Sequence, residues 1–156
     1  MPRIFLVISY LLLPAVVALN AQPQPTQCRG IGSLWQHVYN PGRLEVRKLC
    51  MAVTGVIAGK VNEHDGDVHI RLKLDSQFAG LLNDGNRAHQ GGNLVVEPIC
   101  DHVVTQPDAV AACEDFHPTI PRFKSGTRVV IVGSYVHDKE HGWMEIHPVV
   151  RMTEIQ

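Results

Sequence analysis

Five stretches of the chain carry the hydrophobic pattern of β-strands, and the clearest lies in residues 67–75. There Val68, Ile70, Leu72 and Leu74 alternate with polar residues. A period of two over eight residues predicts a half-buried strand rather than a helix. Four further β-rich segments are predicted as strands: 46–61, 93–100, 127–136 and 142–150.

The segments between these strands indicate the fold. Residues 105–113 (TQPDAVAAC) predict a short helix between the third and fourth strands. Residues 75–92 form a long connection, which in a compact domain is typical of a binding loop. Three strands, a short helix and two strands is the element order of an OB-fold, a five-stranded Greek-key barrel. An all-β, OB-like barrel is therefore predicted; a β-sandwich is the alternative, but it would need about seven strands.

The N-terminus reads as a secretory signal peptide. Arg3 precedes the apolar run IFLVISYLLLPAVVAL, and Ala18 and Ala21 offer cleavage points. A membrane anchor is the competing interpretation, but the run is short for a span and no similar run follows. We therefore expect a secreted or periplasmic protein without a transmembrane segment after cleavage. The predicted parts are a signal peptide (1–21), an N-terminal arm (22–44) and the barrel domain (45–156).

Four cysteines follow the predicted cleavage point: Cys28, Cys50, Cys100 and Cys113. An even count in an exported chain predicts two disulfides. The pairs Cys28–Cys50 and Cys100–Cys113 are favoured because each closes a local loop. A zinc site made of all four cysteines is the alternative, but no CxxC pair supports it.

Charge and motifs exclude several function classes. The formal net charge is −1 with neutral histidines, which argues against non-specific nucleic-acid binding, because that needs many Lys and Arg residues on phosphates. The sequence contains no GxSxG, HExxH or GKS/T motif. No catalytic residue is therefore assigned.

Polar side chains follow three of the predicted strands. His69 alternates away from the apolar set of its strand, Glu97 alternates away from Val96, and Trp143, Glu145 and His147 share one side of the last strand. An OB barrel pairs its second strand with its third and its third with its fifth. Cross-strand neighbours have Cβ atoms about 5 Å apart. We therefore expect the two histidines and two glutamates to converge.

Six segments, in this order, resemble a group of small uncharacterised secreted proteins of bacteria and archaea: HVYNPGRLEV, CMAVTGVI, DGDVHIRLKLD, LVVEPIC, DAVAAC and HDKEHGWMEIHPV. In that group a GDxHxxL strand is followed by an acidic VVE strand and a final HGWxEIHPV strand. The resemblance implies export and an OB-like fold, and no particular activity. It marks as signature positions Asp67, His69, Glu97, His141, Trp143, Glu145 and His147.

Three functions are compatible with two imidazoles and two carboxylates. The first is an exported binding module whose partner is a small molecule, a glycan or an envelope protein. The second is a metal-dependent hydrolase, in which His69, Glu97 and His147 bind a divalent ion such as zinc and Glu145 is the general base. The third is a structural hydrogen-bond network. The plainest interpretation of the pattern is a strand face exposed to solvent.

Overall fold

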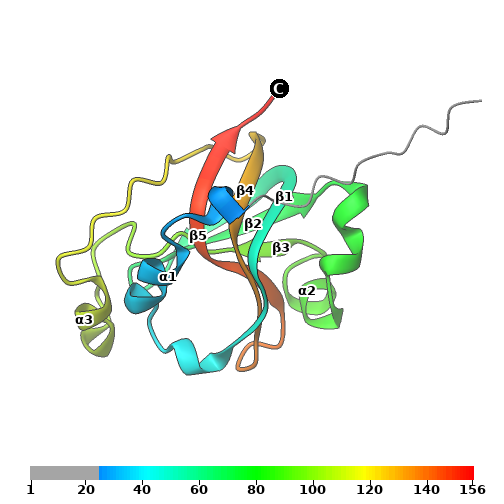
Figure 1. The fold of residues 1–156 in the computed structure, drawn as a ribbon. Helices are drawn as coiled ribbons and strands as arrows, with labels where there is room; N and C mark the ends of the chain where they lie inside the picture. The colour runs from blue at the N-terminus through cyan, green and yellow to red at the C-terminus, as the bar shows by residue number, and fades with distance from the viewer. Residues whose placement is uncertain (1–24) are drawn as a thin grey trace, which may run out of the picture.

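The computed structural model describes residues 25–156, so the predicted signal peptide lies outside the described residues. Five strands form one mixed sheet, and its order β1-β2-β3-β5-β4 returns to β1, which makes a barrel-like ring (Figure 1). The strands are β1 (Leu44–Asn62), β2 (Val68–Leu74), β3 (Leu94–Val96), β4 (Arg128–Asp138) and β5 (Met144–Glu154).

The strand pairing places β2, β3 and β5 side by side. The predicted convergence of the polar residues on these strands depends on this order. β2 and β3 are antiparallel, with Ile70 opposite Val96. β3 and β5 are parallel, with Val95 opposite Glu145. The third strand is shorter than predicted, but it is extended by backbone hydrogen bonds from Glu97 N–H to Ile146 O and from Val149 N–H to Glu97 O.

The interior of the ring is apolar throughout. Alternate residues of all five strands meet there, among them Val53, Ile57, Leu72, Leu94 and Ile131, and each is at most 1% exposed. The period of two in residues 68–74 therefore gave the correct inward set for β2.

Strict alternation along β5 predicts that Val150 faces the interior with Met144 and Ile146, and this prediction is wrong. Val149 takes the interior position, and Val150 packs outside the ring against Cys28 and Ile31. The reason is an irregular register, since β5 has an extra residue relative to β4 between Ile146 and Val149.

The connection from β2 to β3, predicted as a binding loop at residues 75–92, is itself folded. It contains η4 (Ser76–Leu81) and α2 (Asp84–His89), and the side chains of Asn83 and Asn86 cap α2 reciprocally. Asn86 also clips this connection to β5, because its amide bonds both the N–H and the C=O of Met144.

The connection passes close to the β4–β5 hairpin. An added Cβ at Gly85 would lie 2.1 Å from the carbonyl oxygen of Gly142, so only glycine fits there.

The N-terminal arm and the β3–β4 connection lie together on the other side of the sheet (Figure 1). The arm contains η1 (Pro25–Cys28), α1 (Ile31–Leu34), η2 (Trp35–His37) and η3 (Pro41–Arg43), and the connection contains η5 (Pro107–Ala109) and α3 (Val110–Cys113). Apolar residues of both segments pack on Val136 of β4; they are Leu34, Trp35, Val38, Ile99, Cys100 and Phe116. A helix before β4 was predicted correctly.

Both predicted disulfides are present, Cys28–Cys50 and Cys100–Cys113. The first ties the arm to β1, and the second closes the connection that carries α3. Disulfides of this kind fit an oxidising compartment. Within residues 25–156 no helix has the length and apolar character needed to cross a membrane.

Candidate functional site

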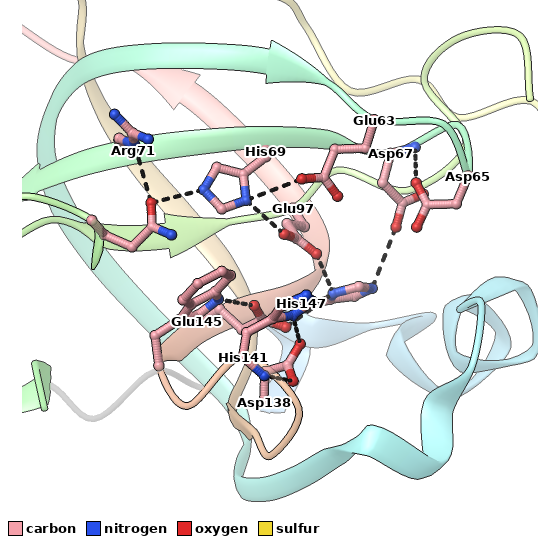
Figure 2. A network of polar contacts seen from close by, with 12 residues as sticks. Glu63, Asp65, Asp67, His69, Arg71, Glu97, Asp138, His141, Glu145 and His147 are labelled. Atoms are coloured by element: carbon pink, nitrogen blue, oxygen red, sulfur yellow. Dashed lines mark hydrogen bonds and ion pairs between the residues drawn. The ribbon is translucent and has the colours of Figure 1, made fainter. Parts of the chain in front are cut away.

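The structure brings the two histidines and two glutamates of the predicted site into direct contact on the outer side of the ring (Figure 2). Glu97 lies at the centre. Its Oε1 is 3.1 Å from His69 Nδ1, and its Oε2 is 2.7 Å from His147 Nδ1. The same nitrogen of His147 is 3.2 Å from Glu145 Oε1. Glu97 is therefore shared by both imidazoles.

The expectation of a solvent-exposed face is wrong. Glu145 and His147 are fully buried, Glu97 is 3% exposed and His69 is 7% exposed. Segments outside the strands contact these side chains and help to bury them. Arg43 of the arm lies 3.8 Å from Glu97, and Gln90, just after α2, places its Oε1 3.0 Å from His69 Nε2. Alternation along a strand predicts the direction of a side chain, not what packs on it.

The three remaining predicted residues extend the same network. Asp67 accepts a hydrogen bond from the Cys100 backbone N–H, and its other oxygen is 3.6 Å from His147 Nε2. Trp143 Nε1 donates a hydrogen bond to Glu145. The ring of His141 stacks on Trp143 with centroids 4.6 Å apart. All seven predicted positions therefore belong to one connected group.

The structure adds five further members to the group. Arg43 of the arm contacts both Asp138 of β4, at 3.2 Å, and Glu97, at 3.8 Å. Glu63 lies 3.4 Å from His69. Glu63 and Asp65 belong to the same turn as Asp67, so their position in the chain could have indicated them. Asp138 lies in the predicted last hairpin, three residues before His141, so the hairpin sequence indicates it as a candidate. Arg43 and Gln90 reach the site only through tertiary packing, and no local pattern marks them.

We call the charged part of this group the polar cluster: Arg43, Glu63, Asp65, Asp67, His69, Glu97, Asp138, His141, Glu145 and His147. Its six carboxyl groups face one arginine and three imidazoles. A negative excess remains even if every imidazole is protonated. Because isolated buried charges are costly, the cluster must hold protons or a cation.

The pKa shifts show where protons are held. Burial and the charge of Glu97 raise the pKa of Glu63 to about 7. Burial raises the pKa of Asp67 to about 8, although His147 acts in the opposite direction. Burial would also raise the pKa of Glu97, but hydrogen bonds from His147 and His69 hold it well below its usual range. Among these three carboxyl groups, Glu97 is therefore the one whose surroundings favour the ionised form.

Three groups among the described residues bring ligand atoms within 4.8 Å of one another. The group of Asp67, Cys100 and Cys113 is unsuitable, because both cysteines form a disulfide and offer no thiolate.

The group of Asp67, Glu97 and His147 is also poor. The two carboxylates approach opposite nitrogens of the imidazole, Nε2 and Nδ1. An ion bound to either nitrogen would therefore face only one of the two carboxylates.

The group of Glu63, His69 and Glu97 has the geometry of a cation site. Both carboxylates approach the same atom, His69 Nδ1, with oxygens at 3.4 and 3.1 Å. Two ligands that each lie about 2.1 Å from one tetrahedral zinc ion are about 3.4 Å apart. The observed separations match the edges of such a coordination shell.

The other nitrogen of His69 is held in place. Its Nε2 lies 3.0 Å from Gln90 Oε1, which also accepts a hydrogen bond from Arg71 Nε. Because that oxygen can only accept, Nε2 is the donor. A metal-binding histidine commonly donates its second N–H to such a partner, which fixes the tautomer and the ring orientation. When His69 loses its Nδ1 proton, as metal binding requires, the lone pair of Nδ1 therefore faces the two carboxylates.

The single-ion arrangement expected from the sequence, with His69 and His147 as joint ligands, does not appear among these groups of described residues. The two imidazoles lie on opposite oxygens of Glu97. No family model, curated protein or solved structure matches this chain.

Proposed function

We propose that this chain is an exported, OB-like binding module that holds one divalent cation, with zinc as the best fit, through Glu63, His69 and Glu97. The observation that carries the proposal is the approach of two carboxylate oxygens to His69 Nδ1 while Gln90 occupies Nε2. One imidazole and two carboxylates suit zinc and similar ions.

The fold and the export are supported separately. The ring order β1-β2-β3-β5-β4 with parallel β3 and β5 is the order of an OB barrel. Two disulfides are typical of exported domains. The apolar N-terminal run has the sequence pattern of a secretory signal peptide.

Metal analysis of untagged protein, followed by zinc titration in a calorimeter, tests the cation site. We expect one equivalent of zinc to bind and to stabilise the fold by about 2.7 kcal/mol at a hundredfold excess over Kd. His69→Gln should abolish binding, and His89→Gln, at an exposed histidine of α2 outside the cluster, should not.

A third variant separates a metal site from a structural network. Gln90→Leu removes the acceptor of His69 Nε2 and should weaken zinc binding by about 10–100-fold. If the protein contains no metal and a chelator leaves its melting temperature unchanged, His69 is a structural imidazolium and the proposal fails.

Metal-dependent hydrolysis is a second candidate, favoured by one contact. His141 Nδ1 lies 2.8 Å from Asp138 Oδ2, and the half-exposed imidazole lines the same cleft as Glu63. A histidine held this way can serve as a general base through Nε2. Glu145 does not suit that role, because it is fully buried and bonded to Trp143 and His147.

Zinc-loaded protein can be assayed with p-nitrophenyl acetate and bis(p-nitrophenyl) phosphate. Zinc-dependent turnover that is lost in His141→Ala would support hydrolysis. Turnover equal to that of the zinc-free protein would leave the binding module as the function.

A further inference from the structure

An open cleft of about 540 Å³ lies beside the polar cluster, between the arm, the β1–β2 turn and the β4–β5 hairpin. Its volume is within the range of small-molecule sites. Three carboxyl groups line it: those of Glu63 and Asp65 on the turn, and that of Glu140 on the hairpin. Glu63 is a ligand of the proposed cation site, so Asp65 and Glu140 are the two carboxylates of the cleft that the proposed function leaves unused.

Asp65 is the carboxylate that points to a ligand. The residue is only 8% exposed and lies on the turn at one end of the polar cluster (Figure 2). Its Oδ1 accepts a hydrogen bond from the backbone N–H of Asp67. Its Oδ2 has no partner within residues 25–156, but it keeps accessible surface, unlike the unpartnered oxygens of Asp67 and Glu97. Because a buried carboxylate is costly without a compensating charge, a positive group that enters the cleft would stabilise it.

Glu140 brings a second uncompensated charge from the hairpin. Its Oε1 accepts a hydrogen bond from Asn40 Nδ2 at 3.3 Å, and it forms no ion pair within residues 25–156. The arginine of the lining does not neutralise the cleft, because Arg43 is already opposed by Asp138 and Glu97. The accessible part of the cleft therefore favours a cationic molecule.

The arrangement of the carboxylates restricts the kind of cation. No group of three residues in the described part of the chain that brings ligand atoms within 4.8 Å of one another includes Glu140 or pairs Asp65 with Glu63. One metal ion needs several ligands around a single point, so these carboxylates do not form a second metal site.

Two carboxylates on separate segments instead match a molecule with two separate positive charges. Ammonium groups suit them, since each donates up to three hydrogen bonds and charge-assisted bonds to carboxylates are strong. Tyr39 also lines the cleft, and the face of an aromatic ring attracts ammonium groups.

We infer that the cleft binds a linear aliphatic diamine, with one ammonium group on Asp65 Oδ2 and the other on Glu140. An anionic molecule would be repelled by these carboxylates, and an uncharged one would leave both without a counter-charge. Neither Asp65 nor Glu140 is a proposed zinc ligand, so the diamine site and the zinc site can be tested separately.

NMR titration of isotopically labelled protein tests the inference, after metal has been removed by dialysis. Putrescine and cadaverine are the diamine probes. Butylamine, butanediol and succinate are comparisons of similar length that carry one positive charge, no charge and two negative charges. We expect the diamines to shift the amide signals of residues 39–43, 61–65 and 138–142, butylamine to bind more weakly, and butanediol and succinate to cause no shifts there.

Matched variants that remove charge but keep shape test the two contacts. Asp65→Asn retains the oxygen that accepts from the Asp67 N–H, and Glu140→Gln retains the acceptor for Asn40. Each should weaken putrescine binding about tenfold, as expected for the loss of one charge-assisted hydrogen bond. Glu154→Gln, at an exposed position at the end of β5, should leave putrescine binding unchanged.

Four outcomes would overturn the inference: neither diamine binds; butanediol or butylamine binds as tightly as putrescine; the shifts lie outside the cleft; or Asp65→Asn and Glu140→Gln bind putrescine as tightly as Glu154→Gln. A protein that binds putrescine but no zinc would refute the proposed cation site and leave the diamine site in place.

Discussion

Where β2, β3 and β5 meet at the polar cluster, both sides of the sheet are buried, but they are chemically opposite. On the inner side Leu72, Leu94 and Ile146 are fully buried in an apolar core. On the outer side Glu97 and His147 are at most 3% exposed, yet both are ionisable. The same alternation that fills the ring with aliphatic side chains thus places charged groups under the arm and the β3–β4 connection.

The difference shows that the two sides stabilise the fold by different means. Aliphatic packing is non-directional and tolerates exchanges of similar volume. A buried network of charges depends on each partner, because removal of one leaves the others without compensation. The polar cluster on the outer side should therefore tolerate fewer substitutions than the apolar interior.

An isosteric pair of variants should show this contrast most strongly. Glu97→Gln keeps the volume but removes the charge shared by His69 and His147, and we expect it to cost about 3–5 kcal/mol, as for other broken buried ion pairs. Leu72→Met in the interior should cost less than about 1.5 kcal/mol. Denaturant unfolding in a chelator, with both disulfides intact, measures the difference.

The contrast would be refuted if the two variants were equally stable. It would also be refuted if Glu97→Ala were no worse than Leu72→Ala, for which a loss of about 2–5 kcal/mol is expected from cavity formation alone.

The fold was largely readable from the sequence because its signals are local. The period of two in residues 68–74 gave the strand and its inward face, and the spacing of the cysteines gave both disulfides. The extra residue between Ile146 and Val149 was not readable, since a register shift depends on the partner strand.

The site was readable only in part, for a related reason. Strand order and alternation brought His69, Glu97, Glu145 and His147 together in advance. Strand order and alternation do not indicate which segments pack over a strand face, so they did not predict the burial of the polar cluster. Arg43 enters from a segment that does not belong to the sheet until Leu44, and only the folded arm places it beside Glu97.

Removing the Cys100–Cys113 disulfide should give a second distinction between the polar outer side and the apolar inner side of the sheet. Loops of about this length predict a loss of about 3 kcal/mol. The Cys100→Ala/Cys113→Ala double variant should also loosen the cover of the cluster, because the Cys100 N–H donates to Asp67. Hydrogen exchange measures this as faster exchange of the amides of residues 97–102.

The matched control is the Cys28→Ala/Cys50→Ala variant, which frees the arm from β1. It should lose a similar amount of stability, about 3 kcal/mol by the same loop-closure relation, while the amides of residues 97–102 stay protected. Equal exchange in both variants would show that the cover does not depend on its own disulfide.

The smallest loss of stability is expected at a partly exposed ion pair. Asp75, just after β2, accepts hydrogen bonds from Arg128 at the start of β4 and from Thr54 of β1. Arg128 and Thr54 lower the pKa of Asp75 below its ordinary value of 3.8. A carboxyl group with a lowered pKa stabilises the folded state above the pKa of the unfolded chain, and this contribution is lost as the pH falls through the folded-state pKa.

Asp75→Asn should therefore lower the melting temperature slightly at pH 7 and not at all near pH 2. Because the pair is partly exposed, salt should reduce this difference in melting temperature at pH 7. The loss of stability in Glu97→Gln should persist in salt. A salt-insensitive effect at Asp75 would remove the distinction between buried and partly exposed charges.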